Sequence, residues 1–357
     1  MPESIYLRPT AFIDSPIGFD GVAQRLAGGL IWFSAVEVIE RDGPKRLVSI
    51  AGMEGELDRL GGRAQEQWRR LTAPRPALQL GQRVVRLDQP QVAGIVNVTP
   101  DSFSGDGRDA DAEAAIAQAH AMSAAGAAMI DVGGESTRPG SQPVWEGDEE
   151  ARVMPVVRPL AAAGVAVSID TRKAVIASLA LQAGAGMVND VSALTFDPRT
   201  VEVVAKAACP IVLMHHQGSP ETMQQAPRYD GPVTLSVYDW LEERIAAAVA
   251  AGIAREKIVV DPGIGFGKSV QHNLELLNNL ALLHGLGCPI MVGASRKRTI
   301  GALSNEAPAG ERLGGSLTLA LKAVEQGAQI LRVHDVFETV QALRVWRGLR
   351  DAALTAG

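Results

Sequence analysis

Polar residues recur along this chain, each at the end of a short apolar run. They are Asn97, Asp131, Asp170, Asn189, His215, Asp261, Ser295 with Lys297, and Arg332 with His334. Ionised carboxylates such as Asp170 and Asp261 can each accept two parallel N–H groups of a ligand. A site that gathers these residues would suit a flat heterocycle with hydrogen-bond donors along one edge.

Basic residues follow several of the same runs, namely Arg138, Lys268, Arg296, Lys297, Arg298, Arg332 and His334. The whole chain has 34 Lys and Arg against 40 Asp and Glu, a formal net charge of −6. Positive charge gathered in a cleft attracts an anion even in an acidic protein. We therefore expect a phosphate-like group at the rim of the site. The net charge gives no reason to expect binding to nucleic acid or anionic lipid.

Two phosphate-binding motifs are excluded in the glycine-rich stretch from Asp261 to Ser269. A P-loop needs a glycine five residues before the glycine of Gly-Lys-Ser, and Pro262 stands there. The glycines at 263, 265 and 267 also fail the dinucleotide-binding spacing. A zinc site is not predicted at His215 and His216, because neighbouring residues on a strand point to opposite faces.

The elements that would position these residues repeat between residues 92 and 333. Short apolar runs alternate with alanine-rich helical segments, and glycine ends helices at Gly126, Gly184 and Gly327. Apolar strands that alternate with helices are typical of a parallel sheet covered on both faces. The eight runs are 92–98, 128–132, 166–169, 187–188, 210–214, 258–260, 289–292 and 329–333.

Eight such units over about 260 residues predict a (β/α)8 TIM barrel, with a doubly wound open sheet as the alternative. Active sites of these barrels lie at the carboxyl ends of the strands, where the polar residues stand. The first part of the chain has another pattern, with strand-like runs at 28–39, 45–50 and 78–87 and an amphipathic helix at 54–71. We predict an α/β class protein with two domains, a small N-terminal α/β module of unassigned role over 1–88 and the barrel over 89–357.

The sequence also predicts the cellular compartment of the protein. The residues from Met1 to Ser4 lack the basic and apolar regions of a signal peptide, and no run of 18 apolar residues occurs that could form a membrane span. Cys209 and Cys288 cannot make a disulfide framework and are read as buried thiols. A cytoplasmic protein without membrane partners is expected.

Two long motifs resemble the signatures of the dihydropteroate synthase family. One is GIVNVTPDSFS from Gly94 to Ser104, and the other is DVGGESTRPG from Asp131 to Gly140. Shorter matches follow in the family's order at 168–171, 188–190, 213–215, 261–263, 295–297 and 332–335. The resemblance runs from about residue 92 to the C-terminus. The segment before it is not part of the family's usual barrel.

The resemblance implies a transferase of folate biosynthesis. Such enzymes condense 6-hydroxymethyl-7,8-dihydropterin pyrophosphate with p-aminobenzoate, giving 7,8-dihydropteroate and pyrophosphate, and they are sulfonamide targets. It also implies Mg²⁺ as cofactor, a homodimer, and a dissociative substitution in which Mg²⁺ assists the departure of pyrophosphate.

The resemblance assigns residues to each part of the site. The pterin would contact Asp170, Asn189, Met214, Asp261 and Lys297. The pyrophosphate would contact Asn97, Arg332 and His334, with Asn97 also ligating the metal. The p-aminobenzoate would contact Phe103, Thr137, Arg138, Pro139 and Phe266, with Arg298 as a candidate contact to its carboxylate. The catalytic residues would be Asp101, Lys297, Arg332 and His334.

Two other functions are considered. A pterin-dependent methyltransferase shares a related barrel and pterin pocket but does not need a pyrophosphate clamp, so Arg332 and His334 argue against it. A non-catalytic pterin-binding homologue is the second, and the motifs show no lesion that favours it.

Overall fold

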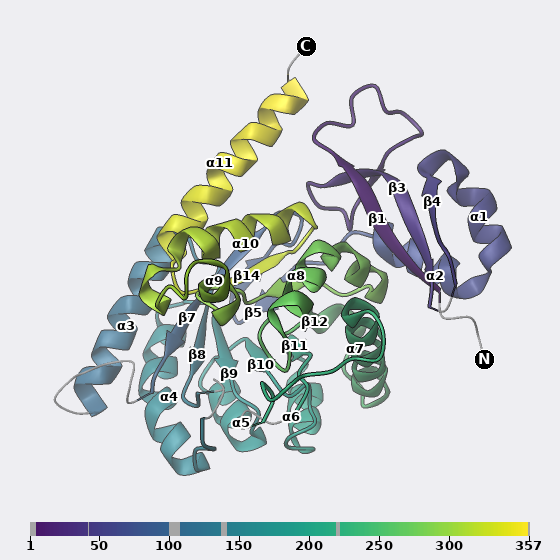
Figure 1. The fold of residues 1–357 in the computed structure, drawn as a ribbon. Helices are drawn as coiled ribbons and strands as arrows, with labels where there is room; N and C mark the ends of the chain where they lie inside the picture. Colours follow the sequence, from purple (N-terminus) through teal and green to yellow (C-terminus); the bar gives the residue numbers. More distant parts are fainter. Residues whose placement is uncertain (1–4, 42, 100–107, 137–140, 219–221, 356–357) are drawn as a thin grey trace.

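The computed structural model describes residues 5–41, 43–99, 108–136, 141–218 and 222–355. They form two parts that pack against each other (Figure 1). A barrel of parallel strands with surrounding helices begins at Gln91, and a small module made from residues 5–72 lies on its outside.

Eight parallel strands close into the barrel. From β7 to β12 each strand pairs with the next along the chain, and β14 pairs with both β13 and β7. A bridge between Val260 and Ile290 joins β12 to the residue before β13 and completes the ring. The closed ring confirms the prediction of a TIM barrel and excludes the alternative, a doubly wound open sheet. The strands are β7 (Gln91–Asn97), β8 (Met129–Gly133), β9 (Val167–Asp170), β10 (Met187–Asp190), β11 (Ile211–Met214), β12 (Ile258–Asp261), β13 (Met291–Val292) and β14 (Ile330–Val333).

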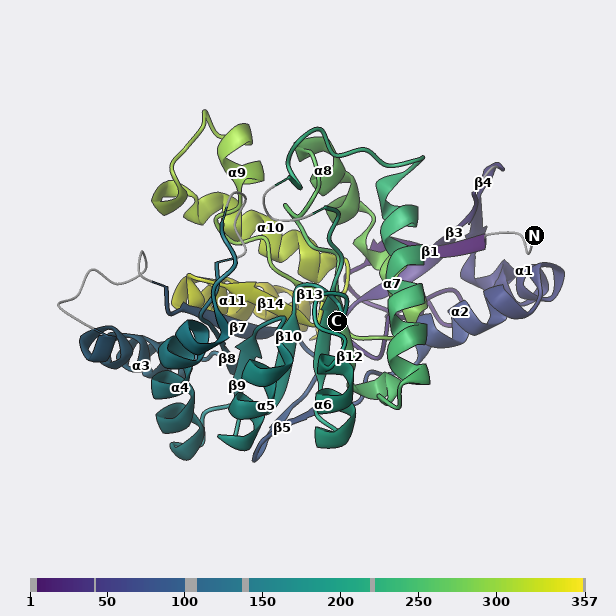
Figure 2. The same cartoon turned by 90° about the horizontal axis from the view of Figure 1, so that it is seen from below.

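Helices cover the outside of the barrel, as Figure 2 shows. They are α3 (Arg108–Ala125), α4 (Glu146–Ala162), α5 (Ala174–Gln182), α6 (Thr200–Ala207), α7 (Val233–Ala250), α8 (Val270–Asn278), α10 (Leu313–Glu325) and α11 (Val336–Thr355). Shorter helical turns are η2 (Arg255–Lys257), η3 (Leu280–Leu286), α9 (Arg298–Leu303) and η4 (Ala309–Glu311). Among the helices in the described ranges, none combines the length and apolarity needed to span a bilayer.

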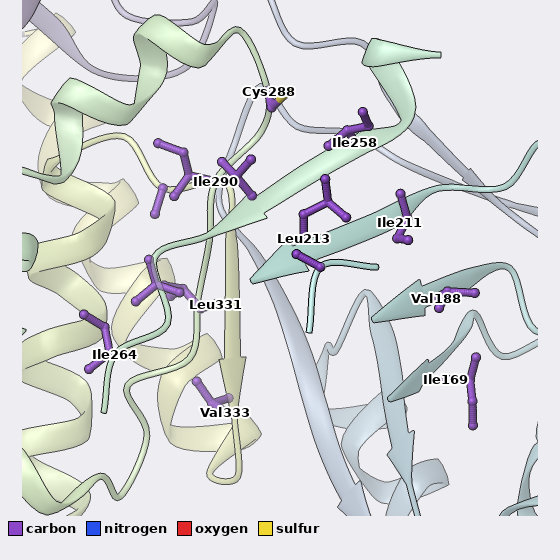
Figure 3. Close-up of a cluster of buried hydrophobic side chains, with 14 of the residues drawn as sticks. Ile169, Val188, Ile211, Leu213, Ile258, Ile264, Cys288, Ile290, Leu331 and Val333 are labelled. Atoms are coloured by element: carbon purple, nitrogen blue, oxygen red, sulfur yellow. The ribbon is translucent and has the colours of Figure 1, made fainter. Parts of the chain in front are cut away.

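The barrel strands bury both faces, so their side chains alternate between two apolar layers. On β11, Ile211 and Leu213 join the layer between strands and helices, whereas Val212 points into the barrel. Figure 3 shows the outer layer, in which Val188 and Ile258 from the two neighbouring strands lie near them. This double burial explains why the strands appear in the sequence as continuous apolar runs.

A hairpin seals the amino-terminal end of the barrel. β5 (Leu78–Leu80) and β6 (Arg83–Val85) pair antiparallel about Gly81, whose φ of +58° suits glycine. The sequence predicted a single strand over 78–87, and this turn divides it in two. The hairpin lies below the barrel strands in Figure 2. Its four buried apolar side chains, Leu78, Leu80, Val85 and Leu87, pack on interior residues of the barrel such as Met129, Met187, Met291 and Ile330.

The N-terminal module is an antiparallel sheet with two helices packed on it. In it β3 (Trp32–Glu40) pairs with β1 (Ile5–Ile13), β2 (Gln24–Arg25) and β4 (Lys45–Ser49). Strands β3 and β4 confirm the runs at 28–39 and 45–50, but β1 was not predicted. The expected helix at 54–71 is two helices, α1 (Met53–Leu60) and α2 (Gly62–Thr72), because Gly61 between them has a φ of +80°. A 3-10 turn, η1 (Ile50–Gly52), precedes them.

Polar contacts attach the N-terminal module to α7 of the barrel and attach its first strand, β1, to α2. The Tyr6 hydroxyl donates to Oδ1 of Asp239 on α7 over 2.9 Å, and Arg41 pairs with the same carboxylate. Within the module, the Gln67 side chain accepts from the Leu7 amide at 3.0 Å and donates to the Ile5 carbonyl at 2.7 Å. The Gln67 amide thus satisfies backbone groups of β1 that face away from β3.

Candidate active site

The barrel brings the predicted polar residues to one mouth. Asn189 of β10 stands opposite Asp170 of β9, and Met214 of β11 stands opposite Asp261 of β12. All four lie at or next to the last residue of their strand. Because the strands are parallel, their carboxyl ends open on the same side of the barrel. The mouth is therefore lined by groups from at least four neighbouring strands.

Arg332 of β14 connects strands from across this mouth. Its Nε donates to Oδ2 of Asp131 on β8 at 2.5 Å, and its Nη2 donates to Oδ2 of Asp170 on β9 at 2.5 Å. Asn189 also donates from Nδ2 to the same Oδ2 of Asp131, at 2.9 Å. Residues separated by up to 201 positions thus share one hydrogen-bonded cluster. We call these four residues the mouth cluster.

Burial shapes the charges in the mouth cluster. Burial, together with the nearby Asp131, raises the pKa of Asp170 to about 7 against the opposing effect of Arg332. Burial lowers the pKa of Arg332, but the attraction of Asp131 and Asp170 outweighs it and leaves that pKa above the usual range. The cluster therefore pairs one buried cation with two carboxylates, whose mutual attraction opposes the cost of burying their charges.

Asp261 lies at the end of β12 with 5% of its surface exposed. Its Oδ1 accepts from the backbone N–H of Gly263 at 2.7 Å. Burial raises the pKa of Asp261, while that hydrogen bond and the positive charges of Lys297, Arg332 and Lys268 lower it. A ligand that donates N–H groups would compensate the buried carboxylate in the same way.

Lys268 does not lie at the rim as the basic pattern predicted. Only 2% of its surface is exposed. Its Nζ donates to Nδ1 of His215 at 2.8 Å and to the carbonyls of Gly263 and Phe266, each at 3.0 Å. Burial lowers the pKa of Lys268 to about 7 and also lowers that of His215. The lysine therefore holds the loop after β12 against the end of β11.

Lys297 and Phe266 form one wall of the mouth. The Lys297 Nζ lies 4.1 Å from the centre of the Phe266 ring, within the range of a cation–π contact. Met214, 5% exposed, lies at the end of β11. The three residues come from the loops after β12 and β13 and from β11.

The loop after β13 and the end of β14 are joined by two polar contacts. The Ser295 hydroxyl lies 3.1 Å from Nδ1 of His334. Arg296 donates from Nε to Oδ2 of Asp335 at 3.0 Å. Arg296 is therefore engaged in fixing the loop, whereas His334 directly follows the last residue of β14, two positions after Arg332.

The other predicted residues divide into two groups. Asn97 ends β7 with its side chain half-buried, and Arg298 is exposed at the start of α9. Asp101, Phe103, Thr137, Arg138 and Pro139 lie outside the described residues. In the described part of the chain, no group of three or more His, Cys, Asp or Glu side chains could hold a metal ion.

Sequence reasoning missed a buried ion network beside the mouth. Lys173 pairs with both Glu149 of α4 and Glu135, and donates to the Val144 carbonyl at 2.7 Å. Arg172 adds a hydrogen bond to Oε1 of Glu135 at 3.0 Å. Charged residues near a helix start are usually solvated, so their types gave no signal of burial. The one signal in the sequence that could have marked this network is that Glu135 lies within the DVGGESTRPG motif.

Comparisons with known proteins agree with this geometry. Residues 93–334 match the family described as pterin binding enzyme. The dihydropteroate synthase of Escherichia coli (strain K12) is 48% identical over 260 residues, which cover 72% of this chain and 91% of that protein. The Neisseria meningitidis serogroup B enzyme of the same name is 47% identical over 277 residues, 76% of this chain and 96% of that protein.

Solved structures give the same result. The Xanthomonas albilineans dihydropteroate synthase with 4-aminobenzoic acid matches with a TM-score of 0.73 and 45% identity, over 77% of this chain and 98% of that one. The same enzyme in complex with 7,8-dihydropteroate matches with a TM-score of 0.70 and 43% identity, over 77% and 99%. The Yersinia pestis enzyme in a sulfonamide drug complex matches with a TM-score of 0.73 and 44% identity, over 77% and 100%.

Proposed function

Because this chain belongs to the dihydropteroate synthase family of pterin binding enzymes, we propose that it catalyses the reaction of that family. It joins 6-hydroxymethyl-7,8-dihydropterin pyrophosphate to p-aminobenzoate and releases 7,8-dihydropteroate and pyrophosphate. The observation that carries the proposal is the mouth cluster, in which buried acceptors and a cation converge at the carboxyl ends of the strands.

The pterin pocket consists of Asp170, Asn189, Asp261, Met214 and Lys297. The carboxylates and the amide oxygen accept from the amino and ring N–H groups of the pterin, which compensates their burial. Met214 supplies an apolar face for the flat ring. Lys297 donates to an acceptor atom of the ring.

The pyrophosphate binds at the rim, between Asn97, Arg332 and His334. An arginine suits phosphate because its planar guanidinium can donate two parallel N–H groups. Mg²⁺ fits this site, since it is commonly held by few protein oxygens together with substrate phosphates, and the half-buried Asn97 offers one amide oxygen at a strand end. When bound, the ion neutralises charge on the leaving group.

The chemical step is a substitution at the methylene carbon of the pterin. The C–O bond breaks and its electron pair leaves with pyrophosphate, whose charge Arg332 and His334 stabilise. The pterin ring delocalises the positive charge left on the carbon, and Asp101 stabilises it. The amine of p-aminobenzoate then attacks, forms the C–N bond and loses a proton. Exclusion of water protects the carbon from hydrolysis.

The p-aminobenzoate packs against Phe266. The other residues assigned to its subsite are Phe103, Thr137, Arg138 and Pro139. Arg298 contributes a positive charge toward its carboxylate. The same subsite would accept sulfonamides, as the drug complex of the Yersinia pestis enzyme suggests by analogy.

The proposal includes a homodimer in the cytoplasm. On α11 the apolar side chains of Phe337, Val345 and Leu349 are 62%, 62% and 70% exposed, which suits contact with a second copy. The buried free thiols of Cys209 and Cys288 suit a reducing compartment. Light scattering at micromolar concentration should give twice the 37.6 kDa mass of the chain, and a monomer would contradict this part.

The direct test mixes the protein with both substrates and follows dihydropteroate. We expect product in the presence of Mg²⁺ and little after exhaustive chelation, with recovery when the ion is returned. Absence of product with both substrates would refute the activity. Full activity after chelation would contradict only the metal and the role of Asn97.

A further inference from the structure

Asp131 is the most buried member of the mouth cluster, and the proposed pterin and phosphate contacts do not include it. Its exposed fraction is 1%. We infer, on the basis of the proposed function, that Asp131 is a positioning residue, whose single Oδ2 sets the orientation of both the Asn189 amide and the Arg332 guanidinium. It acts through these two residues and does not itself touch the substrate.

The first consequence concerns the Asn189 amide. An amide can be turned by 180°, which exchanges its donor and acceptor ends. A carboxylate paired with arginine only accepts, so the Asn189 NH₂ must face Oδ2 of Asp131, as it does at 2.9 Å. The carbonyl oxygen of Asn189 is therefore turned away from Asp131. A ligand at the mouth meets an acceptor, which selects an edge rich in N–H groups.

The second consequence concerns the Arg332 side chain. Its Nε and Nη2 form the side edge of the planar guanidinium, and they are held by Asp131 and Asp170 from two different strands. Two contacts along one edge fix both the direction and the plane of the group. The end edge, made by Nη1 and Nη2, is the one that an incoming anion would meet.

The second oxygen of the Asp131 carboxylate is poorly satisfied. Oδ1 is buried without a hydrogen-bond partner among the described residues. A buried acceptor without a partner is unfavourable for folding, so stability alone gives a weak reason for aspartate at this position. The two contacts through Oδ2 give a functional reason.

Asp190, in the same sheet, provides a matched comparison. It follows Asn189 on β10 and is 0% exposed. Its oxygens accept from the Ser192 amide at 2.7 Å, the Ser192 hydroxyl at 2.6 Å and the Leu194 amide at 2.8 Å. These bonds hold the loop after β10 and do not reach the mouth cluster. Asp190 is a buried strand-end carboxylate with a local structural role.

The test compares Asp131→Leu, Asp131→Asn and the control Asp190→Leu in the full chain. Leucine removes both contacts, and we expect the KM for the pterin pyrophosphate to rise about 30-fold, with the KM for p-aminobenzoate changed less than about 3-fold. Asparagine keeps an acceptor toward Asn189 and Arg332, so Asp131→Asn should recover most of the pterin affinity. Asp190→Leu should lower the unfolding midpoint without a selective effect on the pterin.

Direct titration with the pterin pyrophosphate, without p-aminobenzoate, gives the same comparison independently of turnover. An unchanged pterin affinity in folded Asp131→Leu would overturn the inference, and so would equal losses for both substrates. If the leucine variant does not fold, Asp131→Asn tests the inference instead. Its pterin affinity is compared with that of Asn189→Ala, and an equally large loss in both variants would contradict the role of the acceptor at position 131. A wild-type protein that binds the pterin but makes no product would refute the proposed reaction and leave this inference standing.

Discussion

At the amino-terminal end of the barrel, the hairpin β5–β6 inserts Leu78, Leu80, Val85 and Leu87 among apolar interior residues. At the carboxyl-terminal end, the same strands present Asp131, Asp170, Asn189, Asp261 and Arg332. One end gains stability from burial of apolar surface, and the other bears buried charge that a ligand can compensate. The comparison separates residues that stabilise the barrel from residues that bind the substrate and take part in catalysis.

The largest effect should follow from removing an acceptor at the polar end. We expect Asp261→Ala to lower kcat/KM by about 100-fold or more, because a pterin N–H then loses a charged partner in a buried site. The unfolding midpoint should remain close to that of the wild type, since the burial of this carboxylate is not favourable by itself. Steady-state kinetics with thermal unfolding as the control measure both. Near-normal turnover would remove Asp261 from the pocket.

Removing a buried apolar side chain at the amino-terminal end should lower stability and leave the activity of the folded protein nearly unchanged. Leu80, 1% exposed, contributes to the sealed end, and Leu80→Ala should lower the free energy of unfolding by about 2–5 kcal/mol. Urea unfolding monitored by circular dichroism measures this loss. The kcat of the folded fraction should stay within about 2-fold of the wild type. A large loss of kcat in fully folded protein would show that the two ends are coupled.

A smaller effect concerns pH. The pKa of Asp170 is raised by burial to about 7 in the folded protein, from 3.8 in the unfolded chain. Protonation therefore favours the folded state, and this contribution is complete below about pH 4 and lost as the pH rises through 7. Since the pterin needs the carboxylate, the KM for the pterin pyrophosphate should fall several-fold between about pH 6 and 8.

The control for the pH effect is Asp170→Asn. This variant should show weaker pterin binding and a flat KM across the same range, because the amide does not titrate. Lys268 also has a pKa of about 7, lowered by burial from 10.5, but its contribution to stability is lost as the pH falls through 7 from above 10. A slope that persists in Asp170→Asn would assign the titration to another group.

The smallest effect is expected at the exposed rim. Arg298→Ala should raise the KM for p-aminobenzoate about 3-fold and leave the KM for the pterin pyrophosphate unchanged, because exposed charge pairs contribute little. A matched exposed arginine far from the mouth, such as Arg158 of α4, serves as the control. Equal KM values for both variants and the wild type would remove Arg298 from the p-aminobenzoate subsite.

The polar end could be predicted from sequence more fully than the apolar end. Asp170, Asn189 and Asp261 terminate apolar runs, and a closed parallel barrel forces such positions together. The pattern therefore gave both the fold and the location of these residues. It also gave the glycine helix ends, since Gly126, Gly184 and Gly327 all have positive φ in the structure.

Pairing between distant residues could not be predicted in the same way. Nothing in the letters around Arg332 shows that Asp131 and Asp170 will bind it, because these contacts depend on three-dimensional closure. Lys268 was expected at the rim because loop lysines are usually exposed, yet here two carbonyls and His215 compensate its burial. The turn at Gly81 was missed because its local signal is short, and the nine-residue strand β1 was missed because Pro9 in its middle argues against a strand.

The contact of Gln67 with β1 has a consequence for association between molecules. The outer edge of a sheet normally offers free backbone groups to which another extended chain can add. Here one side-chain amide occupies the Leu7 N–H and the Ile5 carbonyl, so a visiting strand would first have to displace it. Because Ile5, Tyr6 and Leu7 are also buried, this edge of the appended sheet is protected against the addition of a strand from a second molecule.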